Sequence, residues 1–288
     1  MHKSGTTIVL TAGEWQATIV TVGAGLASLT RRQRHVVIPH APEEMPLAHL
    51  GKVLIPWPNR ITGGRFTFEG QTLTPAINDR AGNTAIHGLL AWHNWAIREQ
   101  SPTHVVLSAF LPPTYGYPFM LMADVTYQLD EAAGLRVRIS GSNAGDTPAP
   151  YGVGMHPYLT CNLHDINACE LALPAAQILE IDAARLHPAG DEGLDFRTPR
   201  RIADTHIDHT FKAPSSARWE ARLSHPTMSV WLRAEAPWIQ VYSGEKLGRV
   251  GLAVEPMSCP PNAFNSGIDV VRLAPGETHT LNMEIGGE

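Results

Sequence analysis

Two side chains of the kind that carry protons in catalysis stand in unusual settings in this sequence. The first is His156, which lies between two glycines and a proline in YGVGMHPYLTC, residues 151–161. Glycine admits backbone angles that other residues avoid and proline fixes one of its own, so together they can aim the imidazole from the end of a strand. The alternative is a turn with a satisfied histidine beside the core, and this stretch alone leaves both interpretations open.

The second is Glu255, in GLAVEPMSCPPNAFNSG, residues 251–267. It ends an apolar run and precedes Pro256, so a strand delivers a carboxylate near its end. A carboxylate among apolar neighbours is costly to bury without a partner or a role. A structural ion pair accounts for it equally well.

Three further stretches set polar side chains among glycine, proline and aromatic residues. They are PWPNRITGGRF (56–66) with Asn59 and Arg60, GNTAIHGLLAWHNW (82–95) with His87 and His93, and DTHIDHTF (204–211) with Asp208 beside His209. Arg60 taken singly fits an exposed ion pair, because most arginines are exposed. A histidine followed by glycine indicates little by itself.

The last of these stretches also offers metal-ligand side chains in His206, Asp208 and His209. Along a strand, positions 206 and 208 share a face while 209 points away. No second histidine-rich segment supplies the remaining ligands of a known site. We therefore expect no metal.

The elements that must position these residues are strands. Short runs rich in Val, Ile, Thr, Leu and aromatic residues alternate with Gly, Pro, Asn and Asp, and several show period-two alternation, which indicates strands with one buried face. The clearest runs are residues 15–22, 104–110, 119–129, 134–143, 228–234 and 238–242.

Residues 65–75 predict a hairpin that turns at Glu69-Gly70, and only short helical turns are expected, around 43–51. No linker or repeat divides the chain, although it holds 23 prolines and 25 glycines. The expectation is one domain over residues 1–288, a large antiparallel β-sandwich, because two apolar sheet faces can cover each other without helices.

Composition and net charge bear on which classes of partner the protein is expected to bind. The chain of 288 residues is 43% hydrophobic and 17% charged, with a formal net charge of −5. This balance gives no electrostatic reason to expect nucleic acid or an anionic membrane as a partner, and RRQRH (31–35) fits a solvated hairpin end.

Three irregularly spaced cysteines, Cys161, Cys169 and Cys259, fit neither a disulfide framework nor a zinc knuckle, and free thiols favour a reducing compartment. No signal-peptide run or membrane span is evident, so a cytoplasmic location is expected. The sequence does not indicate an oligomeric state.

Taken together, the motifs resemble those of the aldose 1-epimerases, mutarotases of the galactose mutarotase type, and most closely a bacterial branch with short loops. The resemblance runs from about residue 15 to residue 280. Its anchors, in family order, are PWPNRI, IHG followed by tryptophan, YGVGMHPYL, DHTF, and EPMSCPPNAFNSG with LAPGETH near the end. It implies a large β-sandwich with a sugar pocket on one concave sheet face.

The resemblance also implies roles. Arg60, His87 and Asp208 match the residues that bind sugar hydroxyls, with Asn59 beside them, while His156 matches the catalytic acid and Glu255 the catalytic base. The chain departs from the family in the segment between WIQVYSG and GLAVEP, which is only a few residues long. A binding residue contributed by the longer loop in the family cannot be placed in this sequence. Trp238, Gln240 and Tyr242 are candidates for the pocket wall.

This chemistry accounts for the residue types. An aldose inverts its anomeric centre by opening to the aldehyde, rotating about C1–C2 and closing again. Opening takes a proton from the C1 hydroxyl and gives one to the ring oxygen, which a carboxylate and an imidazole on opposite sides can do. The partner is a small sugar, and no cofactor is required.

Three alternatives remain open. A non-catalytic carbohydrate-binding protein would need no acid–base pair. A sugar-phosphate mutarotase would need cations near the phosphate, for which Arg31, Arg32, Arg34 and Arg65 are available. A mutarotase for an anionic C6-substituted hexose such as sulfoquinovose would share the catalytic pair, so the group at C6 stays open.

Overall fold

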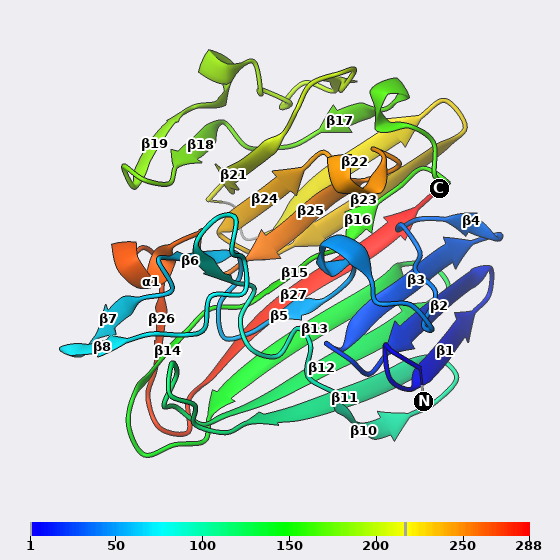
Figure 1. Ribbon diagram of the computed structural model, residues 1–288. Coiled ribbons are helices and arrows are strands. Elements are labelled where there is room, and N and C mark those ends of the chain that lie inside the picture. The colour runs from blue at the N-terminus through cyan, green and yellow to red at the C-terminus, as the bar shows by residue number, and fades with distance from the viewer. Residues whose placement is uncertain (1, 216–217) are drawn as a thin grey trace.

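A computed structural model describes residues 2–215 and 218–288. Two large antiparallel sheets form its frame (Figure 1). The nine-stranded sheet runs in the order β10 (Ala96–Gln100), β11 (His104–Leu111), β12 (Leu121–Asp130), β13 (Gly134–Asn143), β27 (Thr278–Gly287), β23 (Met228–Ala234), β22 (Trp219–His225), β17 (Glu170–Ala172), β20 (Arg200–Arg201).

The eight-stranded sheet carries the candidate site. Its order is β19 (Arg185–Pro188), β18 (Gln177–Glu180), β21 (Asp208–Lys212), β24 (Trp238–Tyr242), β25 (Leu252–Met257), β15 (Gly154–Met155), β5 (Val53–Leu54), and β16 (Tyr158–Leu159) also pairs with β25.

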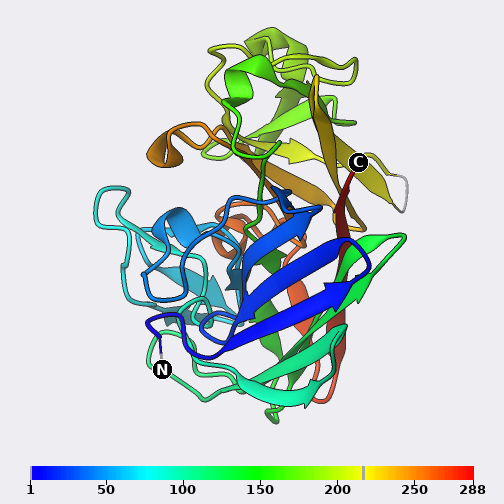
Figure 2. The ribbon, with the colours of Figure 1, turned by 90° about the vertical axis from the view of Figure 1, so that its right-hand side faces the viewer.

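Smaller elements surround these sheets. A four-stranded sheet, drawn in blue at the front of Figure 2, consists of β1 (Thr7–Ala12), β2 (Trp15–Val20), β3 (Gly25–Arg31) and β4 (Arg34–His35). The strand pairs are β6 (Arg60–Thr62) with β9 (Thr84–Ile86), β7 (Phe66–Phe68) with β8 (Gln71–Leu73), and β14 (Ala149–Tyr151) with β26 (Val271–Leu273). The helical turns are η1 (Leu47–His49), η2 (Ile166–Ala168), η3 (Ala189–Glu192), η4 (Glu245–Leu247) and α1 (Ala263–Ser266).

The predicted all-β antiparallel architecture is confirmed. In β13 the alternation works as expected: Leu135, Val137 and Ile139 are buried, whereas Arg136 and Arg138 are exposed. Most residues that point inward form one large cluster that extends from Ile8 in β1 to Ile285 in β27, beside two small clusters around Tyr158 and Trp238. Burial of this alternating apolar face is the main stabilising contribution to such a sandwich.

The predicted hairpin also forms, as β7 and β8, with Glu69 and Gly70 in the left-handed conformation that its turn requires. The short helical turn expected near residues 43–51 is η1. Cys161, Cys169 and Cys259 are buried free thiols. No helix among the described residues is long and apolar enough to cross a membrane.

Candidate active site

A pocket of about 450 Å³ opens over the middle of the eight-stranded sheet. Turns η1 and η4, which contact each other, and the segment around β6 and β9 surround it on the face toward the viewer in Figure 1. Its lining residues are Ala48, His49, Asn59, Arg60, Asn78, Asp79, Ile86, His87, His156, Tyr158, Asp208, Gln240, Tyr242, Lys246 and Glu255.

His156 and Glu255 meet at the base of this pocket. The distance from His156 Nε2 to Glu255 Oε1 is 3.4 Å, and the two side chains are only 7% and 2% exposed. His156 Nδ1 and Glu255 Oε2 have no hydrogen-bond partner among the described residues. Buried polar atoms are normally paired, so these atoms have capacity for a polar ligand.

Burial sets the charge state of the pair. It raises the pKa of Glu255 well above its usual range, aided by the nearby Asp208 charge, and it lowers the pKa of His156 to about 3. Both directions favour the uncharged forms, a carboxyl group that keeps its proton beside a neutral imidazole. Moving that proton to the imidazole gives a carboxylate and an imidazolium without a change in total charge.

Neighbouring backbone and aromatic groups hold His156 in place. The His156 N–H donates to Lys52 O at 3.0 Å, and Gly51 N–H donates to His156 O at 2.9 Å. The imidazole stacks on Tyr158, with ring centroids 5.0 Å apart and planes 15° from parallel.

The glycines beside His156 were expected to supply unusual backbone angles, and this expectation is wrong. Neither Gly152 nor Gly154 has a positive φ. A Cβ at Gly152 would lie 2.5 Å from Cys259 Sγ, and one at Gly154 would lie 3.0 Å from Pro58 Cβ. Close approach of neighbouring segments, rather than special backbone angles, therefore requires glycine here.

Arg60 and His87 reach the pocket from neighbouring strand ends. β6 and β9 pair so that Arg60 lies opposite Ile86, and His87 N–H donates to Asn59 O at 2.7 Å. Asn59 and His87 both adopt positive φ, and Asn59 Oδ1 accepts from Arg60 Nε at 3.0 Å. Burial lowers the pKa of His87 well below its usual range, and its Nδ1 is unpartnered.

Asp208 enters the pocket from the start of β21. Its Oδ1 accepts a hydrogen bond of 2.8 Å from Gln240 Nε2, and Gln240 Oε1 accepts from the Thr210 hydroxyl. These two hydrogen bonds hold the exposed Asp208 carboxylate in place through Gln240 on the neighbouring strand, β24. Gln240 therefore belongs to the pocket.

The two aromatic candidates of β24, Tyr242 and Trp238, have different surroundings. Tyr242 lines the pocket, and its hydroxyl accepts from the Lys246 N–H at 3.0 Å. Trp238 is buried outside the pocket lining, because its indole N–H donates to Asp269 at 2.8 Å and its ring packs under Lys212. The short segment that replaces the family's longer loop contains turn η4, and it contributes Lys246 to the pocket lining.

Several lining residues had not been assigned from the sequence: His49, Asn78, Asp79, Tyr158 and Lys246. Tyr158 lies two residues after His156 in the motif already singled out, which was the available signal. His49 lies in the stretch expected only to form a helical turn.

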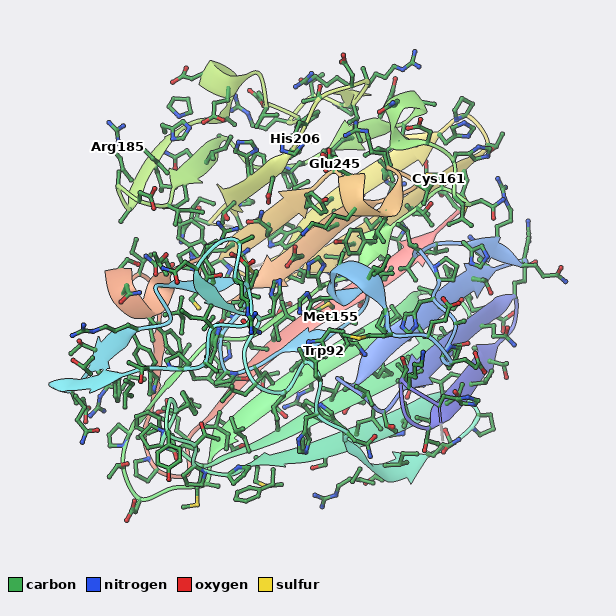
Figure 3. All side chains as sticks on the ribbon, in the orientation of Figure 1. Trp92, Met155, Cys161, Arg185, His206 and Glu245 are labelled. Atoms are coloured by element: carbon green, nitrogen blue, oxygen red, sulfur yellow. The ribbon has the colours of Figure 1, made fainter. Side chains whose placement is uncertain are left out.

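The metal-ligand side chains of residues 206–209 face different partners. His206 Nδ1 contacts Glu245 Oε1 at 2.9 Å (Figure 3), whereas His209 Nε2 contacts Glu192 Oε2 at 3.0 Å. Within residues 2–215 and 218–288, no group of three His, Cys, Asp or Glu side chains is placed to hold a metal ion.

Comparisons with known proteins identify the family of this chain. The sequence model of the family described as aldose 1-epimerase matches residues 6–286, and the chain belongs to that family. It is 54% identical to YihR of Escherichia coli, an uncharacterized protein, over the whole chain and 95% of YihR. It is 24% identical to the aldose 1-epimerase of E. coli, over 84% of this chain and 77% of that protein.

Solved structures share the fold. A GalM/aldose epimerase homologue from Caenorhabditis elegans superposes with a TM-score of 0.85 at 20% identity, over 98% of this chain and 99% of the other. Galactose 1-epimerase from Lactobacillus acidophilus gives 0.83 at 20% identity, over 98% and 94%. These similarities establish the galactose mutarotase-like sandwich.

Proposed function

We propose that this protein is an aldose 1-epimerase that interconverts the α and β anomers of a hexose by opening and reclosing the ring. The observation that carries the proposal is the contact between His156 and Glu255 in the lining of an open pocket, where burial favours the uncharged form of each side chain. The three buried free thiols favour a reducing compartment, and we place the activity in the cytoplasm.

The proposed reaction uses both members of the pair. Glu255, as carboxylate, takes the proton of the C1 hydroxyl, while His156, as imidazolium, gives one to the ring oxygen as the C1–O5 bond breaks. The aldehyde rotates about C1–C2 and closes on its other face, with the two groups in exchanged roles. The assignment of acid and base follows the family resemblance.

Arg60, His87 and Asp208 are proposed to hold sugar hydroxyls. Each lines the pocket, and together they provide a charged donor, a neutral imidazole and a charged acceptor. Gln240 orients Asp208, and Asn59 orients Arg60. Tyr242 forms part of the wall.

An anionic group at C6 is a second candidate feature of the substrate, because Lys246 lines the pocket and the ion pairs of the described residues do not include it. The arginines considered from the sequence lie elsewhere: Arg32 pairs with Glu14, Arg34 binds Thr227, and neither Arg31 nor Arg65 lines the pocket. Arg60 and Lys246 are therefore the cations available for phosphate or sulfonate.

The test is exchange NMR on sugars at anomeric equilibrium, which measures α–β interconversion directly. Glucose, galactose, glucose 6-phosphate and sulfoquinovose are compared with and without the protein, and the spontaneous rate is subtracted. We expect accelerated exchange for at least one sugar, and the ratio among sugars identifies the C6 group. Sugar binding without any acceleration would instead identify a carbohydrate-binding protein.

A further inference from the structure

We propose that His49 is a specificity-determining residue that contacts the group at C6 of the bound hexose. This inference rests on the proposed function, because it uses the positions assigned there to the C1 hydroxyl and the ring oxygen. His49 lines the pocket from turn η1, outside the set of residues that the sequence motifs identified.

The order of strands gives the location. Across the eight-stranded sheet, Asp208 lies on β21, Gln240 on β24 and Glu255 on β25. His156 follows β15, and the next strand is β5, just after turn η1. The strand residues of the site therefore follow one another from Asp208 to Glu255, and His156 comes next, while turn η1 covers the pocket and contacts η4.

A pyranose bound to this row has a defined direction. If Glu255 faces the C1 hydroxyl and His156 faces the ring oxygen, the next ring atom in the same direction is C5, because the ring oxygen joins C1 to C5. The substituent on C5 is C6 with its hydroxyl or charged group. That group then lies beyond His156 from Glu255, where the His49 ring lies 6.3 Å from the His156 ring and lines the same pocket.

Ring contacts fix the His49 side chain at this position. Its centroid lies 4.5 Å from that of His87 and 6.3 Å from that of His156, with the His156 plane only 16° from parallel. Trp92 packs against it, with ring centroids 5.4 Å apart.

The backbone of the turn is held equally firmly. Ala48 and His49 both have positive φ, which L-residues adopt only when their surroundings enforce it. Tyr158 Oη donates to Ala48 O at 3.2 Å, and Lys52 N–H donates to His49 O at 3.0 Å. The turn is therefore tied to Tyr158, on which the His156 ring stacks.

The buried side chain of Lys52 packs against the Trp92 ring and affects the charge state of His49. Lys52 is fully buried, its Nζ donates to Val22 O at 2.6 Å, and it lies 5.2 Å from the Trp92 ring centroid. Burial lowers the pKa of His49 to about 4, and the charges of Lys52 and Lys246 add to this effect. His49 is accordingly a neutral imidazole with one donor and one acceptor, which suits a polar substituent.

The test compares sugars that differ only at C5. Xylose carries hydrogen where glucose carries the C6 hydroxymethyl group, and glucose 6-phosphate and sulfoquinovose carry anions there. His49→Phe keeps a ring to pack against Trp92 and His87 but removes both nitrogens. We expect its kcat/KM to fall about tenfold for the preferred C6-bearing sugar and to change less than about twofold for xylose.

His93→Gln is the matched control, because His93 is exposed and does not line the pocket, and it should leave every sugar unchanged. His49→Gln serves if the phenylalanine variant folds poorly. Equal losses on xylose and on the C6-bearing sugar would overturn the inference while leaving the proposed function intact.

A second readout does not depend on turnover. The His49 ring resonance, identified by its loss in the His49 variant, should shift when the C6-bearing sugar saturates the protein and should stay in place with xylose. An unmoved resonance in a sugar-saturated protein would refute the contact. Absence of anomer exchange by the wild-type protein would instead refute the proposed function, and the resonance would still report on the contact.

Discussion

Replacing Lys52 with methionine should change how the stability of the fold depends on pH. Lys52 is fully buried, and burial lowers its pKa from the ordinary value of 10.5 to about 8. At 1.36 kcal/mol per pH unit, this difference corresponds to about 3 kcal/mol of cost for keeping the ammonium charged in the folded state.

The sign follows from proton binding. Between pH 8 and 10.5 the unfolded chain keeps the Lys52 proton while the folded chain has released it. Raising the pH through this window therefore favours folding, and the wild-type protein should gain about 3 kcal/mol relative to Lys52→Met. Near pH 7 the cost is fully present, and methionine removes it while leaving Val22 O without its donor, a loss of about 1–3 kcal/mol. Removing a cost of about 3 kcal/mol while losing about 1–3 kcal/mol leaves Lys52→Met between equal in stability and about 2 kcal/mol more stable at pH 7.

The assay is urea unfolding of both proteins at intervals from pH 7 to 10.5. Subtracting the two curves cancels the tyrosines, cysteines and other lysines that titrate in the same range. Lys3→Met removes an exposed lysine and should give a curve parallel to wild type. Parallel curves for wild type and Lys52→Met would show that the buried ammonium carries no such cost, and the reasoning would fail.

Three other substitutions test the pocket and the packing around it. Asp208→Asn should lower kcat/KM by about ten- to a hundredfold, the usual effect of losing one hydrogen bond to a charged group, and Arg60→Ala should do the same. Asp204→Asn, at an exposed position outside the pocket, should be silent, and an equal loss there would point to a global effect. Gly152→Ala should destabilise the fold by about 1–3 kcal/mol in urea unfolding, because its methyl group would overlap Cys259 Sγ. Adding Cys259→Ala should restore much of that stability, and a loss that persists would assign another role to the glycine.

Local patterns predicted the strands well because alternation directly reports which face is buried. β23 and β24 begin and end where the runs 228–234 and 238–242 do. The same alternation placed Trp238 with Gln240 and Tyr242 on one face. It could not show that Asp269, from a distant loop, binds the Trp238 indole outside the pocket.

The proposed catalytic pair was accessible to sequence reasoning because each member stands in a motif of its own. His49, Lys246 and Lys52 were not, because their importance depends on which segments meet. Turn η1 adopts left-handed angles at Ala48 and His49 without the glycine that would have marked it. Strand order across the eight-stranded sheet is likewise a long-range property, and it places β5 beside β15.

The most direct test of the central claim is anomer exchange by Glu255→Gln at equilibrium, measured on a sugar that the variant still binds. Glutamine preserves the size of the buried side chain but cannot accept the C1 proton, so exchange should fall by about 10²–10⁴ while binding survives. His156→Asn should behave alike, and the double variant should lose far less than the product of the single losses. Glu99→Gln, on an exposed strand, should retain full activity. Near-normal exchange by Glu255→Gln would contradict the account and leave Glu255 as a buried structural carboxyl group.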